Sequence, residues 1–292
     1  MAIFERLKNT ARAVLTSTSK SAAASLDALL QLELSKQLAR LQAEVRTAMP
    51  ENPAACGFKV YSQADEDGIV EEITRRIGID RGHFIEIGCG DGRENNSHYL
   101  LLKGWSGIWV DGDPDNIAAI RAALPLDRRL RLVEQMVTRD NVTTIPTAAG
   151  SPDFGALDLL SVDVDGNDLA IAESAIIAWS PKVVIGEYNA KFPYPIQQEV
   201  SYDPLHRWKR DDYHGASLAT WVERLKPEYR LVTCNLAGTN AFFVREDVAG
   251  QFQVCAPAQL YQPARFHLTA LRSGHAPSLS FLRNSLRSDS VA

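Results

Sequence analysis

The residues of this chain whose types and spacing could bind a cofactor are glycines and acids around one short apolar segment. Residues 84–87 form a mainly apolar run typical of a buried parallel strand, and Gly88, Gly90 and Gly92 follow at once. Glycines at these positions allow a tight turn and let a ligand approach bare backbone. A second apolar run ends in Asp111, close to the spacing of about twenty residues at which an acid binds ribose hydroxyls in nucleotide-binding folds.

The charge around the glycines distinguishes between two classes of cofactor. A pyrophosphate needs a cradle of backbone amides, and nearby carboxylates repel it. S-adenosylmethionine carries an ammonium and a sulfonium and has no phosphate, so acids beside the turn suit it. We therefore predict a cofactor site made of Glu86, Gly88, Gly90, Asp91, Gly92 and Asp111, with Asp113 as a second ribose candidate. An NAD-type oxidoreductase that uses the same turn and Asp111 is the alternative.

A second group of acids follows two further predicted strands. The apolar segment 156–164 runs into Asp163 and Asp165, and the next apolar run ends at Glu187. Ligands of open parallel sheets bind at the carboxyl ends of the strands, so these three carboxylates are expected at one site, facing the cofactor. Three interpretations stay open: a Mg²⁺ site that acidifies a hydroxyl, a metal-free general base, and a purely structural acidic turn.

The segment 191–212 predicts a loop that covers this site. It contains three prolines and several aromatic residues and lacks helical or strand periodicity. Side chains with stacking faces or hydrogen-bond donors suited to a sugar are Tyr194, Tyr202, His206, Arg207 and Trp208. His214, which precedes a predicted helix, is a further candidate for a catalytic base.

Four stretches of the chain together resemble the class I S-adenosylmethionine-dependent methyltransferases, and in particular the FkbM-like methyltransferases of bacterial glycan and natural-product pathways. They are YSQADEDGIVEEI (61–73), HFIEIGCGDGRENNSHYL (83–100), LLSVDVDGND (159–168) and PKVVIGEYN (181–189). The resemblance covers roughly residues 60–248. The usual FkbM block is closer to KIDVEGxE, from which SVDVDGND departs.

The resemblance carries several expectations about fold and function. It implies a Rossmann-like α/β fold with a seven-stranded, mostly parallel sheet whose last strand is antiparallel. It implies that a helix after Ser62 lies over the cofactor, which adds Gln63 and Asp67 to the cofactor-binding residues, and that Thr138 or Asp140 contacts adenine. The implied reaction is O-methylation of a hydroxyl on a carbohydrate or glycosylated acceptor. A non-catalytic scaffold on the same fold is a further alternative.

Composition excludes some partners and indicates a compartment. The chain has 292 residues, 45% of them hydrophobic, which is ample for a full core. Its formal net charge of -5 argues against nucleic-acid binding, which needs basic surface. The four cysteines lack metal-ligand spacing, and no run of 18 apolar residues appears. These features predict a cytoplasmic protein.

Residues 1–50 predict a helical appendage to a methyltransferase domain at 58–248, and residues 249–292 an extension that ends in a disordered SDSVA tail. The appendage has no glycine and no proline before Pro50. A leucine-rich stripe repeats on one helical face; it consists of Leu30, Leu34, Leu38, Leu41 and Val45. The stripe either packs on its own catalytic domain, or forms a homo-oligomer through residues 25–48, or docks another protein. The basic first residues allow at most peripheral membrane contact.

Overall fold

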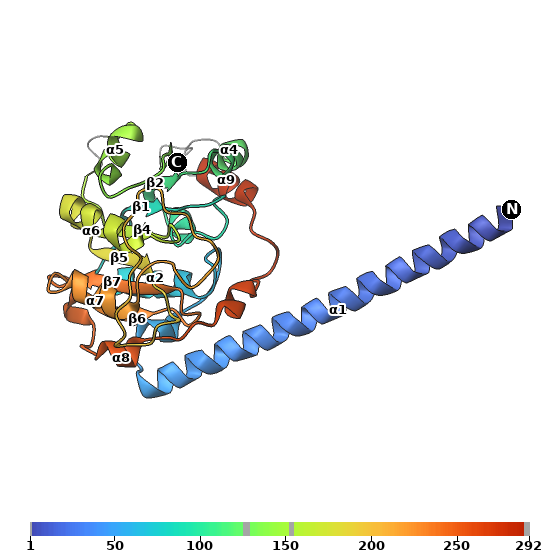
Figure 1. Cartoon of the computed structure of the whole chain (residues 1–292), viewed down its shortest axis with the longest axis horizontal. Coiled ribbons are helices and arrows are strands. Elements are labelled where there is room, and N and C mark those ends of the chain that lie inside the picture. The colour runs from blue at the N-terminus through green and yellow to red at the C-terminus, as the bar shows by residue number, and fades with distance from the viewer. Residues whose placement is uncertain (1, 125–128, 152–154, 289–292) are drawn as a thin grey trace.

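The computed structural model describes residues 2–124, 129–151 and 155–288, and within these ranges it describes the side chains of residues 22–286. Seven strands form one sheet in the order β3-β2-β1-β4-β5-β7-β6 (Figure 1). The strands are β1 (His83–Ile87), β2 (Ser106–Asp111), β3 (Leu130–Glu134), β4 (Leu159–Val162), β5 (Val183–Glu187), β6 (Tyr229–Cys234) and β7 (Asn240–Arg245). β1 to β5 pair in parallel, and β7 is antiparallel to β5 and β6. This is the sheet of the class I methyltransferase fold, so the predicted fold class is confirmed.

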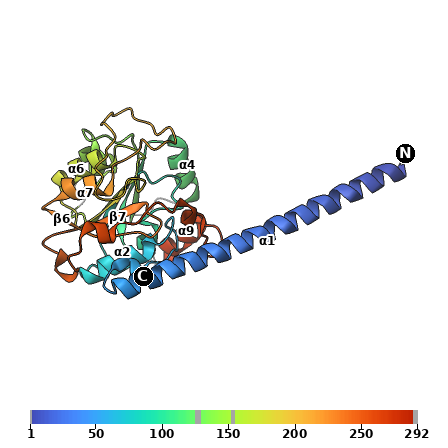
Figure 2. The same ribbon diagram turned by 60° about the horizontal axis from the view of Figure 1, so that its bottom comes forward.

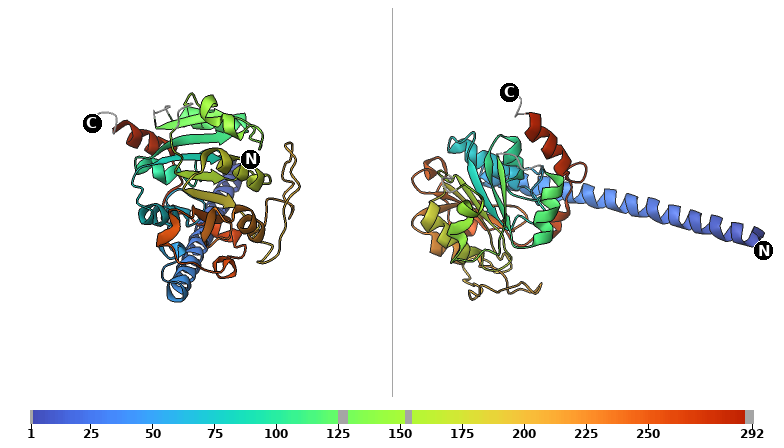
Figure 3. Two further views of the ribbon diagram at one scale, coloured as in Figure 1. Left: turned by 90° about the vertical axis from the view of Figure 1, so that its left-hand side faces the viewer. Right: turned by 90° about the horizontal axis from the view of Figure 1, so that it is seen from above.

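Helices cover both faces of the sheet (Figure 3). The α-helices of the described residues are α1 (Ala2–Ala48), α2 (Glu66–Arg76), α3 (His98–Leu102), α4 (Pro114–Ala123), α5 (Ile145–Ala148), α6 (Asp168–Trp179), α7 (Leu218–Leu225), α8 (Pro257–Leu260) and α9 (Leu279–Ser288). The apolar residues of α2, α4 and α9 pack on one face, and those of α5, α6 and α7 on the other. No helix in the described part of the chain is long and apolar enough to cross a membrane.

Alternation along the central strands explains why the sheet is buried on both faces. In β1, Phe84 packs into the core with α2, whereas Ile85 and Ile87 pack into the core with α6 and α7. In β2, Trp109 packs into the core with α2, and Ile108 packs into the core with α6 and α7. Strands that are apolar on both faces need helices on both, and the helices between successive strands supply them.

The N-terminal helix α1 is a single helix of 47 residues that leaves the body of the protein (Figures 1 and 2). Its end packs on that body, where Leu34, Leu38 and Val45 are 3%, 8% and 8% exposed. Further toward the N-terminus the helix stands free, and Leu26 and Leu29 are exposed. The C-terminal part of the leucine-rich stripe, from Leu34 to Val45, therefore packs on the protein's own domain, which is one of the three alternatives that the sequence leaves open. Association through residues 25–48 stays a prediction.

Hydrogen bonds of single side chains shape the end of β3 and the start of α2. β3 ends at Glu134, because the chain turns there and Asn141 Oδ1 accepts a hydrogen bond from the Thr138 amide at 2.7 Å. Asp65 precedes α2, but its carboxylate does not cap the helix and instead accepts from the Leu236 amide at 3.2 Å.

The two less regular segments follow the sequence more closely. Residues 191–212 form a loop with neither helix nor strand, as predicted, apart from a single bridge at Glu199. The C-terminal extension packs on the body through α9, whose Leu282 and Leu286 are buried. The disorder predicted for the SDSVA tail falls on residues 289–292, outside the described residues, except for Ser288 at the end of α9.

Candidate functional site

The glycine turn lies where β1 and β4 end side by side. Gly88 has a φ of +85°, and a Cβ atom there would lie 1.6 Å from the Asp163 carbonyl oxygen. A side chain at this position would push the two strand ends apart. The Gly88 amide donates to the Val110 carbonyl at 2.8 Å, which ties the turn to β2 as well. The glycine is thus required by the close approach of three strands.

Asp111, at the end of β2, closes the turn from the other side. Its Oδ2 accepts from the Gly90 amide at 2.8 Å, and its Oδ1 accepts from the Asp113 amide at 2.7 Å and from Asn116 Nδ2 at 3.2 Å. Asp113 caps α4 by accepting from the Asp115 amide at 2.9 Å. The Asp111 carboxylate is thereby held rigidly on the cavity wall, with lone pairs left to accept from a ligand hydroxyl.

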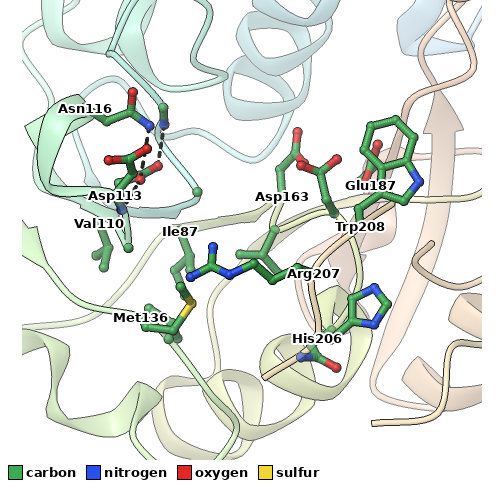
Figure 4. Close-up of a pocket in the computed structure, with 18 of the residues that line it drawn as sticks. Ile87, Val110, Asp113, Asn116, Met136, Asp163, Glu187, His206, Arg207 and Trp208 are labelled. Carbon is green, nitrogen blue, oxygen red and sulfur yellow. Dashed lines mark hydrogen bonds between the residues drawn. The ribbon is translucent and has the colours of Figure 1, made fainter. Parts of the chain in front are cut away.

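A cavity of about 610 Å³ opens along the carboxyl ends of the strands (Figure 4). The predicted residues that line it are Gln63, Gly88, Gly90, Asp111, Asp113, Asp163, Asp165, Glu187, His206, Arg207 and Trp208. A second cavity of about 390 Å³ shares Gln63, Gly88, Gly90 and Asp163 with the first, and Glu86 and Asp91 line it. The two cavities therefore adjoin across the glycine turn, so that one elongated ligand can reach both.

Two predicted cofactor residues hold the backbone rather than face a ligand. Asp67 is fully buried outside both cavities, and its Oδ2 accepts from the amides of Val60, Tyr61 and Ser62 at 2.6–3.0 Å. Burial raises the pKa of Asp67 to about 6, although these amide bonds oppose the shift. The predicted direct contact of Asp67 with the cofactor is therefore not what the structure shows. Its carboxylate orders the turn that leads into α2.

Glu86 has a similar positioning role. Its carboxylate accepts from the amides of Asn96 at 2.8 Å and Ser97 at 3.1 Å, and from the Ser97 hydroxyl. Burial raises the pKa of Glu86. Both of its oxygens are occupied, so it anchors the segment that follows the glycines rather than offering a free oxygen. Gly92 lines neither cavity, since a Cβ there would meet Trp109 and Ile120 in the core.

Asp163, Asp165 and Glu187 come together as predicted. One carboxylate oxygen of each lies within 4.8 Å of the others. Asp163 follows β4 and Glu187 ends β5, so the parallel pairing of these strands brings the acids together. Asp165 has a φ of 57°, which turns the chain sharply at this point. In addition, Glu187 Oε2 is buried and has no hydrogen-bond partner, which favours a ligand or proton at this position.

Burial and neighbouring charges disfavour the ionised forms of these acids. Burial, followed by the charges of Asp168 and Asp165, raises the pKa of Asp163 well above its usual value. Burial and the charge of Asp163 do the same for the pKa of Glu187. Burial raises the pKa of Asp165, and His214 opposes that shift. A carboxylate with a raised pKa is a stronger base, and a cluster of this kind also attracts a cation.

The acidic turn is itself held by Asp168. The Asp168 carboxylate accepts from the amides of Val164 at 2.6 Å and Gly166 at 2.7 Å, and burial raises its pKa to about 6.

His214, the other candidate base, does not line the cavity. It is 9% exposed, burial lowers its pKa, and its ring centroid lies 5.4 Å from that of Trp208. The geometry supports His214 as packing behind the loop rather than as a base.

The loop at 191–212 contributes fewer residues to the cavity than predicted. His206, Arg207 and Trp208 line it, and Figure 4 shows Arg207 extended across it toward Ile87. Tyr194 and Tyr202 do not line it. Thr138 and Asp140, the predicted adenine contacts, do not line the cavity either, whereas residues 135–137 do.

Sequence reasoning missed two buried amides. Asn95 is 4% exposed and Asn240 is 3% exposed; both line the smaller cavity, and the side-chain oxygen of each lacks a hydrogen-bond partner. A buried amide oxygen without a donor is costly, so these oxygens are suited to accept from a ligand ammonium. The polar run ENNS after the glycines could have indicated Asn95. Asn240 starts an ordinary strand and gives no signal.

Comparison with known proteins gives a likeness of fold. No protein-family model matches the chain, and no curated protein matches it significantly. Similar solved structures include a Staphylococcus aureus protein provisionally identified as a caffeoyl-CoA O-methyltransferase (13% identity, TM-score 0.41, covering 71% of this chain and 91% of that one). Others are the Podospora anserina methyltransferase PaMTH1 bound to S-adenosylhomocysteine (15%, 0.40, 72% and 88%) and the glycopeptide N-methyltransferase MtfA with the same ligand (17%, 0.37, 66% and 94%). At this level of identity the likeness concerns the fold alone. The chemistry of the site must be inferred from the residues of this chain.

Proposed function

We propose that this protein is an S-adenosylmethionine-dependent O-methyltransferase that acts on a hydroxyl of a carbohydrate or glycosylated acceptor. The observation that carries the proposal is the joining, in one cleft, of a rigid ribose-type acceptor and a cluster of three acids. Gly88, Gly90 and Asp111 form the first part, and Asp163 and Glu187 belong to the second. The fold places both at the carboxyl ends of neighbouring strands, where ligands of open sheets bind.

Different residues of the cleft suit different parts of S-adenosylmethionine, the proposed methyl donor. Asp111, whose carboxylate is fixed by the Gly90 and Asp113 amides, would accept from the ribose hydroxyls. Asn95 and Asn240 offer unpartnered oxygens to an α-ammonium in the smaller cavity. S-adenosylmethionine supplies an activated methyl group on a sulfonium, so the protein must mainly hold an acceptor oxygen in line and take its proton.

The acidic cluster is suited to take that proton. Burial and neighbouring carboxylates raise the pKa values of Asp163 and Glu187, and Glu187 Oε2 is free of hydrogen bonds. An ionised carboxylate in such a site binds a proton more strongly than one in water. We assign the acceptor hydroxyl to this cluster, with Asp163 or Glu187 accepting its proton as transfer proceeds. Asp165, which is more exposed, completes the binding of the hydroxyl.

The same three residues also fit a magnesium ion. Three carboxylate oxygens within 4.8 Å, one of them buried without a partner, make a donor set of the kind that hard cations prefer. Asp163, Asp165 and Glu187 would hold the ion, and Mg²⁺ would supply Lewis acidity toward the acceptor oxygen. The residues could serve either as direct base or as ligands, and a chelator separates the two.

A sugar is the acceptor that the cavity wall favours. The wall near the acids is polar, and the Trp208 indole lines it with an aromatic face, a combination suited to stacking on a sugar ring while its hydroxyls are hydrogen-bonded. The protein's net charge of -5 makes it a poor match for nucleic acid.

The test is methyl transfer from labelled S-adenosylmethionine to a panel of glycans, with and without chelator. We expect label on oxygen and, for Asp163→Asn, a loss of roughly hundredfold or more in kcat, the lower range for loss of a general base. The matched control is Asp140→Asn, which removes the same charge from an exposed site outside the cavity. Full activity in Asp163→Asn would remove this acid from the mechanism, and label only on nitrogen or protein would contradict the acceptor class.

A further inference from the structure

A buried carboxylate at the start of α2 contacts the wall of the smaller cavity from behind. Glu66 is fully buried and lines neither cavity. Its Oε2 accepts from the Ala64 amide at 2.7 Å. Its Oε1 accepts from Asn235 Nδ2 at 2.6 Å and from Thr239 Oγ1 at 3.4 Å, in the turn that joins β6 to β7. The first residue of α2 is thus tied to a turn that lies far along the chain.

Asn240 connects this carboxylate to the smaller cavity. Its Nδ2 donates to Glu66 Oε1 at 3.3 Å and to Thr239 Oγ1 at 3.4 Å. Both N–H bonds of the amide therefore have acceptors, whereas Oδ1 has no partner. Asn240 begins β7 and lines the cavity, so this oxygen is the part of the amide that is left for a ligand.

The charge of Glu66 decides which end of the Asn240 amide is left for the ligand. Half a rotation about the last bond of an asparagine exchanges its oxygen and its nitrogen at little steric cost. A carboxylate only accepts hydrogen bonds, so it attracts the NH₂ group and repels the oxygen. The reversed amide would bring two oxygens together in a buried place, which is costly. The orientation in which Oδ1 faces away from Glu66 is therefore the stable one.

We propose that Glu66 is a positioning residue that makes the smaller cavity selective for the ammonium of the methyl donor. The inference rests on the proposed function, because that ammonium belongs to S-adenosylmethionine. With Glu66 in place, the cavity presents the Asn240 oxygen, which accepts from an ammonium. Without this charge the amide is free to reverse and to present its NH₂ group, which an ammonium repels. Since Asp163 lines the same cavity, fixing the amino-acid end also orients the methyl group toward the acidic cluster.

Calorimetric titration of the full-length protein with two ligands tests this role without any methyl transfer. S-adenosylhomocysteine carries the amino-acid end, whereas 5′-methylthioadenosine has the same adenosine and sulfur and lacks that end. Glu66→Gln keeps the size of the side chain and removes its charge. We expect it to weaken S-adenosylhomocysteine binding roughly tenfold or more, the effect of one lost hydrogen bond to a charged group, and to leave 5′-methylthioadenosine binding unchanged.

A second variant and a double-mutant cycle separate positioning from a structural role. Glu66→Asp keeps the charge but withdraws it from Asn240 by one methylene, so it should show a selective loss of the same kind, and it carries the test if Glu66→Gln does not fold. When Asn240→Ala is already present, Glu66→Gln should weaken S-adenosylhomocysteine binding by less than about twofold, because its effect passes through that amide. The matched control is Glu71→Gln, the same change on the same helix outside both cavities, which should alter neither affinity.

The titrations also distinguish failure of the inference from failure of the proposed function. Equal loss of both ligands in Glu66→Gln, or losses that simply add in the double variant, would assign Glu66 to the fold alone and overturn the inference. Equal binding of S-adenosylhomocysteine by wild type and Glu66→Gln would also overturn it and leave the proposed function standing. A wild-type protein that binds neither ligand would overturn both.

Discussion

Glu187→Gln is the substitution that tests the electrostatics of the acidic cluster most fully. The change keeps the size of the side chain and removes one of three negative charges whose oxygens lie within 4.8 Å. At an effective dielectric constant of about 20, two unit charges at that distance repel by about 3 kcal/mol. Glu187 faces two such charges, so its removal should stabilise the ligand-free protein near pH 8 by a few kcal/mol at most, since partial protonation already relieves part of the repulsion.

The sign of the pH dependence follows from the raised pKa values of Asp163 and Glu187. An acid whose folded pKa lies above its unfolded value is fully stabilising only below the unfolded value of about 4.3, and this contribution is lost as pH rises through the folded pKa. Wild type should therefore lose stability from this cluster as pH rises from about 5, and Glu187→Gln should lose less. The variant's advantage should be present near pH 8 and small near pH 5.

Thermal unfolding followed by calorimetry measures this difference. Each kcal/mol corresponds to roughly 2–4 °C in Tm for a chain of this size. Added Mg²⁺ should raise the Tm of wild type and raise that of Glu187→Gln less, because the variant has lost one ligand oxygen. A Tm for Glu187→Gln that is lower than wild type by the same amount at both pH values would refute the repulsion and show that the carboxylate is needed for packing.

Three further predictions concern the parts that position the site. Gly88→Ala should abolish binding of S-adenosylhomocysteine in calorimetry, because its Cβ would lie 1.6 Å from the Asp163 carbonyl; retained affinity would contradict the tight turn. Asn95→Ala should weaken that binding by roughly tenfold, the effect of one lost hydrogen bond to a charged group, while denaturant unfolding changes little; unchanged affinity would remove Asn95 from the site. Leu38→Ala should lower the free energy of unfolding by about 2–5 kcal/mol, whereas Leu30→Gln should leave it unchanged and lower the oligomeric mass in light scattering.

The sequence predicts the sheet well because the pattern of apolar residues in each strand indicates which of its faces are buried. The apolar runs around Ile85, Ile108 and Leu160 are continuous, since both faces of those strands are covered. The acid pair Asp163 and Glu187 could be placed together for a related reason, because parallel neighbours end at the same edge. These inferences need only local pattern and the rule that strand ends converge.

Burial and hydrogen bonding of single polar residues could not be predicted in this way. Asp67 and Glu86 look like free acids in sequence, but three-dimensional packing turns each toward backbone amides. Asn240 becomes important only because β7 is inserted beside β5. The stripe on α1 was correctly identified as apolar, yet which surface covers Leu34 depends on how the helix meets the body. Partners that lie far apart in sequence decide the cases of Asn240 and Leu34, whereas the local path of the backbone decides those of Asp67 and Glu86.

The central claim is that the glycine turn and Asp111 form a site for S-adenosylmethionine, and calorimetric titration of the full-length protein measures this directly. We predict that S-adenosylmethionine and S-adenosylhomocysteine bind to one site per chain, and that Asp111→Asn weakens both by roughly tenfold or more while NADH does not bind. Binding of NADH to wild type, with no heat from either S-adenosyl compound, would contradict the account and favour a dehydrogenase on the same turn.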